Sequence, residues 1–399
     1  MTYWQTHELE FIRQNLQADP TRLLLQSNTS LPRRKELIRQ IAARQKARHK
    51  LPGWYAEPDL RFPPALSVEQ ASSEQTAAYK ASLVGRPACL VDLTGGMGVD
   101  ALAFARVADR VIYVEQQPEL AELARYNLPL LGGTNVEIRA GNALEVLRQY
   151  PGTADWVYVD PARRDDRGGR VFRLEDCEPN VADPDTLRLL LTKAHRVLLK
   201  TSPLIDIDSV RHTLPYVEQT QVVAVDNEVK EVLFMLSENL VADGPIKAVN
   251  LRTGPSESHF FSFRRSDESA ASIRFGDPQR YLYEPNASIL KAGAFRSVAD
   301  RFGLTKLAPN THLYTSVELA VDFPGRAFDI RAVVKTDRKT VQALLPESKA
   351  NVSVRNFPEP AEALRKKLGL SDGGDWYLFG TTLTDGSRRL ILTQKSGAS

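Results

Sequence analysis

The stretch LVDLTGGMGVDALAFA, residues 90–105, decides the fold that this sequence predicts. Three glycines, Gly95, Gly96 and Gly98, stand between an apolar run and a segment with helical spacing. Glycine permits tight turns and the close approach of a ligand, and a helix N-terminus offers free N–H groups. In sheets of alternating strands and helices, ligands bind where strands end in such turns. The stretch therefore predicts a strand, a ligand-binding turn and a helix; a tight turn without a ligand is the alternative.

The sequence after this stretch continues in the same rhythm. Short apolar runs rich in valine recur at regular spacing, with helical segments between them. These runs are CLVDLT (89–94), RVIYVE (110–115), VEIRAG (136–141), DWVYVD (155–160) and RVLLKT (196–201). The alternation predicts an α/β fold with a parallel sheet covered on both faces. Two later runs, TQVVAVD (220–226) and EVLFML (231–236), are four residues apart, too close for a parallel crossover, and predict an antiparallel hairpin.

Length and composition indicate several domains and a reducing compartment. The 399 residues exceed what one core usually holds. We expect an N-terminal helical region (1–75), a cofactor-binding domain (76–240) and a C-terminal α+β domain (246–399). The two cysteines, Cys89 and Cys177, exclude a disulfide scaffold. The first residues lack the apolar core of a signal peptide, and no run approaches the ~18 apolar residues of a membrane span. We therefore expect a cytoplasmic protein without a membrane partner.

Two cofactors fit the glycine turn. The segment GMGVDA (96–101) matches the dinucleotide fingerprint G-x-G-x-x-A, and Glu115 follows at about the expected 20-residue spacing, which makes NAD a candidate. S-adenosylmethionine is the other. Asp92 and Asp100 flank the glycines, and their charges would repel a phosphate. The predicted hairpin departs from the dinucleotide-binding sheet, and the fourth strand ends in DPARR (160–164). These features favour S-adenosylmethionine.

Four motifs carry a resemblance to a known family. They are VDLTGGMGVD (91–100), VIYVEQQPELAELARYNL (111–128), VEIRAGNALEVL (136–147) and DWVYVDPARR (155–164). Together they resemble the Rossmann-like (class I) S-adenosylmethionine-dependent methyltransferases. With FPPALSVEQASSEQTAAYKASL (62–83) before them, they resemble a bacterial family whose C-terminal THUMP-like domain is named after an RNA-binding module. The resemblance implies a seven-stranded sheet with an antiparallel last strand.

The resemblance also implies a cofactor site. Gly96 and Gly98 would form the turn, Thr94 would take a place often held by a small residue, Glu115 would bind the ribose hydroxyls, and Asn142 would face the adenine amine, where the family usually has aspartate. The expected cofactor-binding residues are Asp92, Thr94, Gly95, Gly96, Met97, Gly98, Asp100, Glu115, Gln116, Asn142 and Ala143.

The end of the fourth strand is the expected place of the chemistry. Methyl transfer is an in-line displacement, so the enzyme mainly positions the reactants. We expect Asp160, Pro161 and Arg163 to act on the acceptor, with Asp160 able to take its proton. Arg164, Lys200 and Ser202 are expected to contact the substrate. Salt bridges of the two arginines to nearby acids, and a structural cap for Lys200 and Ser202, stay open as alternatives.

Other chemistries find less support in the sequence. Cys177, in EDCEP, lacks the context of a methyltransferase nucleophile, so a packed thiol is favoured. The histidines lack metal-ligand spacing, and no metal is expected.

The expected acceptor is a base of ribosomal or transfer RNA. Three features indicate it: the basic segment 33–50, the segment LARYNL (123–128), which resembles a helix of many RNA methyltransferases, and the THUMP-like resemblance. A protein or small-molecule acceptor stays open. So do an NAD-dependent oxidoreductase and a non-catalytic RNA-binding protein with a relic cofactor site. The target nucleotide, the methylated atom and the oligomeric state cannot be read from the sequence.

Overall fold

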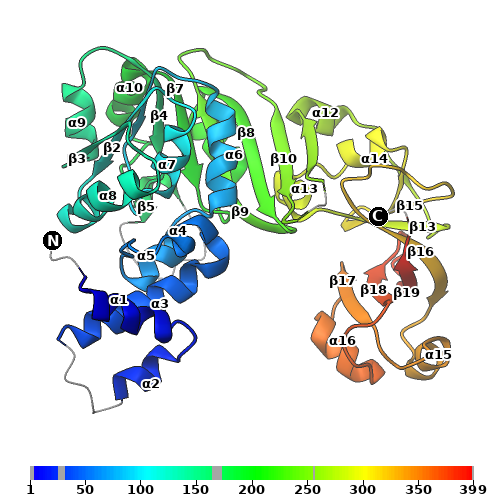
Figure 1. Ribbon diagram of the computed structural model, residues 1–399. Coiled ribbons are helices and arrows are strands. Elements are labelled where there is room, and N and C mark those ends of the chain that lie inside the picture. The colour runs from blue at the N-terminus through cyan, green and yellow to red at the C-terminus, as the bar shows by residue number, and fades with distance from the viewer. Residues whose placement is uncertain (1–3, 26–31, 164–172, 255–256, 398–399) are drawn as a thin grey trace. The chain divides into compact units, whose positions relative to one another are not determined.

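The structure is a computed structural model that describes residues 4–25, 32–163, 173–254 and 257–397 (Figure 1). Arg164 of the expected substrate site lies outside the described residues. The chain divides into two compact units. Unit 1 comprises residues 1–218 and 232–242, and unit 2 comprises residues 219–231 and 243–399.

The first part of unit 1 is helical, as expected. Its helices are α1 (Thr6–Gln14), α2 (Pro20–Leu25), α3 (Arg34–Lys50), α4 (Pro52–Ala56), α5 (Ala65–Gln70) and α6 (Glu74–Val84). Leu37 and Ile41, one turn apart on α3, are fully buried against α1 and α2. Ser73 caps α6 by accepting a hydrogen bond from the backbone N–H of Thr76.

A nine-stranded sheet follows. Its strands are β1 (Cys89–Asp92), β2 (Arg110–Glu115), β3 (Val136–Ala140), β4 (Ala154–Val159), β7 (Ala194–Thr201), β8 (Val217–Val225), β9 (Glu228–Leu236), β10 (Ile246–Leu251) and β11 (His259–Phe263). Their order is β11-β10-β8-β9-β7-β4-β1-β2-β3. The five strands β1 to β4 and β7 are mutually parallel, whereas β9 runs antiparallel to β7. β8 and β9 are neighbours joined by Asp226 and Asn227, both at positive φ, as in a type I′ hairpin turn.

The expected count of seven strands is not confirmed, because the sheet has nine. β10 pairs in parallel with β8, and β11 pairs with β10, so the sheet continues past the expected domain boundary at residue 246. β10 (Ile246–Leu251) begins at the expected domain boundary, directly after the turn-forming residues Asp243, Gly244 and Pro245, and was not predicted as a strand. The result is a mixed α/β fold with a large, largely parallel sheet.

Helices alternate with the strands of unit 1. They are α7 (Val99–Ala105), α8 (Pro118–Leu130), α9 (Ala143–Gln149), α10 (Pro184–Lys193) and α11 (Ile207–Thr213); a 3-10 turn, η1 (Leu174–Asp176), and two short paired strands, β5 (Ala162–Arg163) and β6 (Cys177–Glu178), follow β4. The central strands are almost entirely buried, and each has an acidic residue at its carboxyl end. Asp92, Glu115 and Asp160 all lie at these ends, which parallel pairing brings to one edge of the sheet.

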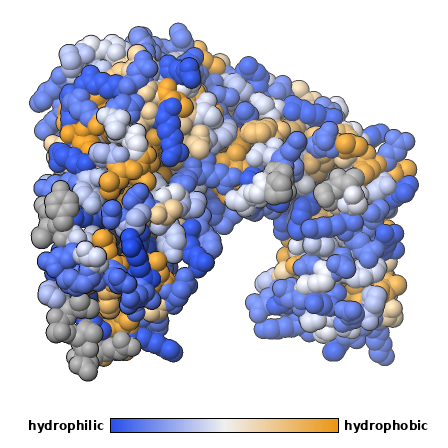
Figure 2. Space-filling view, viewed as in Figure 1, coloured by the Kyte–Doolittle hydropathy of each residue, from blue (hydrophilic) through white to orange (hydrophobic). Residues whose placement is uncertain are grey.

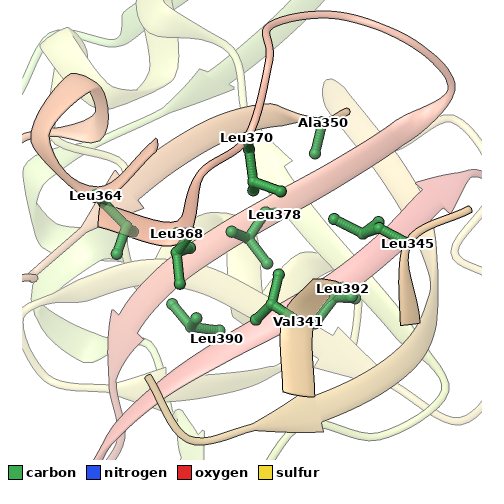
Figure 3. Packing of buried hydrophobic residues seen from close by; sticks show 9 residues of the cluster. All are labelled: Val341, Leu345, Ala350, Leu364, Leu368, Leu370, Leu378, Leu390 and Leu392. Atoms are coloured by element: carbon green, nitrogen blue, oxygen red, sulfur yellow. The ribbon is translucent and has the colours of Figure 1, made fainter. Parts of the chain in front are cut away.

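Unit 2 contains an eight-stranded sheet of order β12-β14-β15-β13-β16-β19-β18-β17. Its elements are α12 (Arg265–Ala270), β12 (Arg274–Phe275), β13 (Tyr281–Pro285), α13 (Ala287–Ala292), α14 (Ser297–Arg301), β14 (Thr305–Ala308), β15 (Thr311–Ser316), β16 (Gly325–Val334), α15 (Arg338–Leu344), β17 (Asn351–Arg355), α16 (Ala361–Leu368), β18 (Trp376–Thr382) and β19 (Arg388–Lys395). Leucines of α16 and of the strands converge on one face of β17, β18 and β19 (Figure 3). Because side chains alternate along a strand, Leu378 points to these helices, and Tyr377 and Phe379 point to the opposite face.

The face of the protein that Figure 2 shows is mainly hydrophilic, with smaller apolar areas. No helix within the described ranges combines the length and the apolar character needed to cross a membrane.

Candidate functional site

The glycine turn between β1 and α7 requires its glycines for two different reasons. A Cβ on Gly95 would lie 2.1 Å from Cε2 of the buried Tyr113, so only glycine fits there. Gly96 and Gly98 have φ of 54° and 92°, a region that other residues rarely adopt. The Tyr113 hydroxyl also donates to the carbonyl of Gly96 at 2.6 Å. Tyr113 therefore packs against Gly95 and holds the backbone of Gly96. The sequence did not predict this role.

Glu115 joins the end of β2 to this turn. One carboxylate oxygen accepts the backbone N–H of Gly96 at 2.8 Å, and the other accepts that of Gln117 at 2.8 Å. An ionised carboxylate has about four acceptor positions, so both oxygens can still accept hydroxyl groups. Glu115 is buried, whereas the neighbouring Gln116 is exposed.

Asp92 carries a buried oxygen without a partner. Its side chain is fully buried, and Oδ1 accepts the backbone N–H of Thr94 at 3.0 Å. Among the residues that the structure describes, Oδ2 has no hydrogen-bond partner. Burial raises the pKa of Asp92 well above its ordinary value, and the negative charges of Asp100, Asp160 and Glu115 raise it further. A cation placed beside Oδ2 would relieve this unfavourable state.

Asp100, at the start of α7, is held differently. Its Oδ2 accepts the hydroxyls of Ser72 at 2.7 Å and Tyr158 at 2.9 Å. Its Oδ1 lies 3.2 Å from Nζ of the fully buried Lys80, an ion pair in which Oδ1 accepts no hydrogen bond within the described structure. Burial acts to raise the pKa of Asp100, but Lys80, Lys200 and the two hydroxyls outweigh it and hold the pKa below its ordinary value. We expected Asp100 to face the cofactor; its carboxylate instead binds protein groups.

The end of β4 lies directly beside the glycine turn. The backbone N–H of Asp160 donates to Oγ1 of Thr94 at 2.7 Å, and the Asp160 carboxylate pairs with Nζ of Lys200 at the end of β7. Pro161 is buried, and Arg163 pairs through β5 with Cys177. The structure thus brings together three residues from separate segments of the sequence, because Asp160 contacts both Thr94 and Lys200.

The remaining predicted residues have other partners or positions. Asn142 caps α9, because its Oδ1 accepts the backbone N–H groups of Leu144 at 3.0 Å and Glu145 at 3.2 Å. The oxygen expected to face adenine is thereby used within the protein, while the Asn142 N–H₂ group is left for other contacts. Ala143 begins α9, Met97 is buried in the glycine turn, and Ser202 accepts the backbone N–H of Leu204 at 3.2 Å.

Cys177 is fully buried, and its thiol donates to the carbonyl of Arg173 at 3.3 Å. This packing agrees with the expected inert thiol. No cluster of three or more histidine, cysteine, aspartate or glutamate side chains with the geometry of a metal site occurs within the described part of the chain.

The basic helix α3 uses much of its charge within the protein. The buried Arg44 donates to the carbonyls of Tyr55, Glu57, Pro58 and Leu60 at 2.7–3.4 Å. Other α3 cations bind carbonyl or carboxylate oxygens of neighbouring segments, namely Arg34, Lys46 and Lys50. These contacts weaken α3 as evidence for RNA binding.

Comparisons with known proteins match this architecture. The chain is 36% identical to a protein classed as a methyltransferase from Porphyromonas gingivalis W83; the similarity covers 99% of this chain and 100% of that one, with a TM-score of 0.87. An uncharacterised S-adenosylmethionine-dependent methyltransferase of Mycobacterium tuberculosis (strain H37Rv) is 25% identical over 309 residues, which are 76% of this chain and 80% of the relative. Residues 281–324 match a ferredoxin-like domain model, and residues 325–395 match a THUMP domain-like model.

These similarities decide between the two cofactors that the glycine turn left open. The similarity to methyltransferases favours S-adenosylmethionine over NAD. The protein is an enzyme, and its cofactor is S-adenosylmethionine. The chain belongs to the bacterial family of Rossmann-like S-adenosylmethionine-dependent methyltransferases that carry a C-terminal THUMP-like domain.

Proposed function

We propose that this enzyme methylates a base of ribosomal or transfer RNA, and that the segment 160–163 positions the acceptor. The observation that carries the proposal is the hydrogen bond from the Asp160 N–H to Thr94, which joins the end of β4 to the glycine turn. In this assignment β3, β2, β1, β4, β7, β9 and β8 are the methyltransferase sheet, and β9 is its antiparallel last strand.

The residues at the glycine turn fit the chemistry of the cofactor. S-adenosylmethionine supplies a methyl group on a positively charged sulfur and also carries an ammonium group. Oδ2 of Asp92, buried and unpartnered in the described structure, would meet this positive charge. Glu115 would accept the ribose hydroxyls with the lone pairs that its backbone contacts leave free. Asn142 would contact adenine through its N–H₂ group.

Asp160 and Lys200 suit the acceptor side of the reaction. The carboxylate of Asp160 is about one-third exposed, so an acceptor can reach it, and Lys200 pairs with it. Asp160 would accept a hydrogen bond from the acceptor amine and take the proton that the amine loses. Pro161, which is buried, would hold the segment in place.

A surface of unit 2 also supports an RNA acceptor. On the sheet face opposite α15 and α16, the cations of Arg326 and Lys395 lie 5.7 and 5.8 Å from the centre of the half-buried Tyr377 ring. Arg326 and Arg355 both pair with the buried Glu284, which fixes their positions. Cations beside an accessible aromatic ring suit phosphates and unpaired bases. We call Arg326, Tyr377 and Lys395 the Tyr377 face.

The acceptor is tested by comparing modified nucleosides of ribosomal and transfer RNA from cells with and without the gene. We expect one methylated nucleoside to be missing without the gene and restored by the wild-type gene but not by Asp160→Ala. If every methylated nucleoside persists, the RNA acceptor is wrong, whatever the protein binds.

The Tyr377 face is tested by RNA binding at several salt concentrations. Tyr377→Leu should weaken binding about 5- to 150-fold, because stacking one base is worth about 1–3 kcal/mol. In a plot of the logarithm of the binding constant against the logarithm of the salt concentration, Lys395→Ala should reduce the slope by about 0.7, the value for one phosphate of a single strand. Lys366→Ala is the matched control, because Lys366 is exposed on α16 and should leave binding unchanged. Equal losses in all three variants would contradict a specific face.

A further inference from the structure

Lys80 is a fully buried lysine in the middle of α6. Its Nζ lies 3.2 Å from Oδ1 of Asp100 and donates to the hydroxyl of Ser72 at 3.0 Å. A buried ammonium group is costly unless it is paired, so this position needs Asp100. No sequence motif indicated the pair, because Lys80 and Asp100 stand in separate segments.

Asp100 links Lys80 to both halves of the reaction site. It is the second residue of α7, two residues after Gly98, so its contacts hold the start of this helix beside the glycine turn. The same carboxylate accepts the hydroxyl of Tyr158, which lies on β4 two residues before Asp160. The buried cluster Ser72–Lys80–Asp100–Tyr158 therefore connects α6, the glycine turn and the acceptor segment.

The charges around the glycine turn are unequal. Lys80 pairs with Asp100, and Lys200 pairs with Asp160. Glu115 accepts two backbone N–H groups. Asp92 has one backbone donor on Oδ1 and, in the described structure, nothing on Oδ2. Of these four carboxylates, Asp92 thus has the strongest need for a cation.

We propose that Lys80 is a positioning residue for the cofactor: by pairing with Asp100 it fixes the start of α7 and leaves Asp92 to receive the positive charge of the cofactor. The inference concerns cofactor binding and does not depend on the nature of the acceptor. Lys80 acts through Asp100 and has no contact with the reacting atoms.

The test uses Lys80→Met, which keeps the length of the side chain and removes its charge. The probe is S-adenosylhomocysteine, which keeps the ammonium group, and its affinity is measured by calorimetry from pH 6 to pH 9. We expect Kd to rise at least about tenfold, the change that one pKa unit of interaction represents. We also expect a second titration in the pH profile, because Asp100 would lose its nearest cation in a buried place.

The groups that would set this titration can be named. Asp100 faces Lys80 from α6, Lys200 from β7 and the hydroxyls of Ser72 and Tyr158, and it interacts with the charge of Asp92 on β1. In Lys80→Met/Asp100→Asn the second titration should disappear and much of the affinity should return, because asparagine needs no buried cation. Loss of folding stability alone would not produce this pH profile or its reversal.

Two outcomes overturn the inference: Lys80→Met binds as the wild type does at every pH, or the double variant binds no better than Lys80→Met. If Lys80→Met fails to fold, Tyr158→Phe tests the same cluster by removing one donor to Asp100. The Kd of Tyr158→Phe for S-adenosylhomocysteine should rise. The hydroxyl of Tyr150 contacts Cys89 instead, so Tyr150→Phe should bind S-adenosylhomocysteine as the wild type does. Equal affinity of both tyrosine variants and the wild type then overturns the inference. Absence of binding by the wild type would instead contradict the proposed cofactor site.

Discussion

Replacing Asp92 with asparagine should stabilise the protein without ligand and weaken cofactor binding. The Asp92 side chain is fully buried, and its Oδ2 has no partner within the described structure. Asparagine has almost the same shape, can keep the hydrogen bond from the Thr94 N–H through its own oxygen, and cannot ionise. The substitution therefore removes a charge from a place where the folded protein alone provides no counter-charge.

The sign of the effect follows from the pKa of Asp92. Burial raises it in the folded state, and nearby carboxylates raise it further. The contribution of such a group to stability is fully present below its unfolded pKa and is lost as the pH rises through the folded pKa. The two proteins should therefore be about equally stable at low pH, and Asp92→Asn should gain the advantage as the pH rises through that folded pKa.

The size of this advantage follows from the cost of an unpaired buried group. That cost is about 1–3 kcal/mol, and it is larger for a charge. At about 2–4 °C per kcal/mol for a domain of 150–250 residues, the midpoint of thermal unfolding should rise by several degrees. Binding should move in the opposite direction: losing one partner of a buried charge pair costs about 2–5 kcal/mol, which is at least about 30-fold in Kd.

Two assays test this reasoning about Asp92. Thermal unfolding is followed from pH 5 to pH 9 without ligand, and the affinity for S-adenosylhomocysteine is measured by calorimetry at pH 7.5. A variant less stable than the wild type at pH 8 to 9, or one with unchanged affinity, would refute the assignment of Asp92.

Three further substitutions test other parts of the argument. Gly95→Ala should lower the free energy of unfolding by about 1–3 kcal/mol, since its Cβ would meet the Tyr113 ring at 2.1 Å; thermal unfolding measures this, and a neutral result contradicts the close contact. Asp160→Ala should abolish methyl transfer from labelled cofactor and leave calorimetric binding of S-adenosylhomocysteine unchanged; retained transfer excludes its role with the acceptor. Arg44→Ala should cost about 1.5–3 kcal/mol of stability, whereas Arg39→Ala, an exposed α3 control, should change it by less than about 0.5 kcal/mol, and denaturant unfolding distinguishes them.

The sequence predicted those features of the fold that depend on local periodicity. The runs at residues 89–94 and 110–115 became β1 and β2, because valine-rich segments between helices can be buried only as parallel strands. The close spacing of the runs at 220–226 and 231–236 likewise identified the hairpin. β10 (Ile246–Leu251) was not predicted, because it follows a turn-rich segment and because its parallel pairing with β8 depends on the tertiary fold.

The site was predictable in position but only partly in contacts. The carboxyl ends of β1, β2 and β4 had to meet, so Asp92, Glu115 and Asp160 could be grouped from sequence. Which carboxylate would be left for a ligand could not be predicted, because it depends on Lys80, which comes from a helix outside the sheet. Asn142 shows the same limit, since a helix cap and an adenine contact require the same oxygen.

Several carboxylates surround the glycine turn, and their charge pairing explains why the turn suits one cationic ligand. If Asp92, Asp100 and Asp160 were all unpaired, their mutual repulsion would raise each pKa and favour protonated, uncharged forms. Two lysines remove that repulsion at Asp100 and Asp160 but leave it at Asp92, where the positive charge of the cofactor can take their place. Transfer of the methyl group removes the charge on sulfur but leaves the ammonium group, so Asp92 should still pair with the product S-adenosylhomocysteine. The product therefore tests this carboxylate in the same way as the cofactor does.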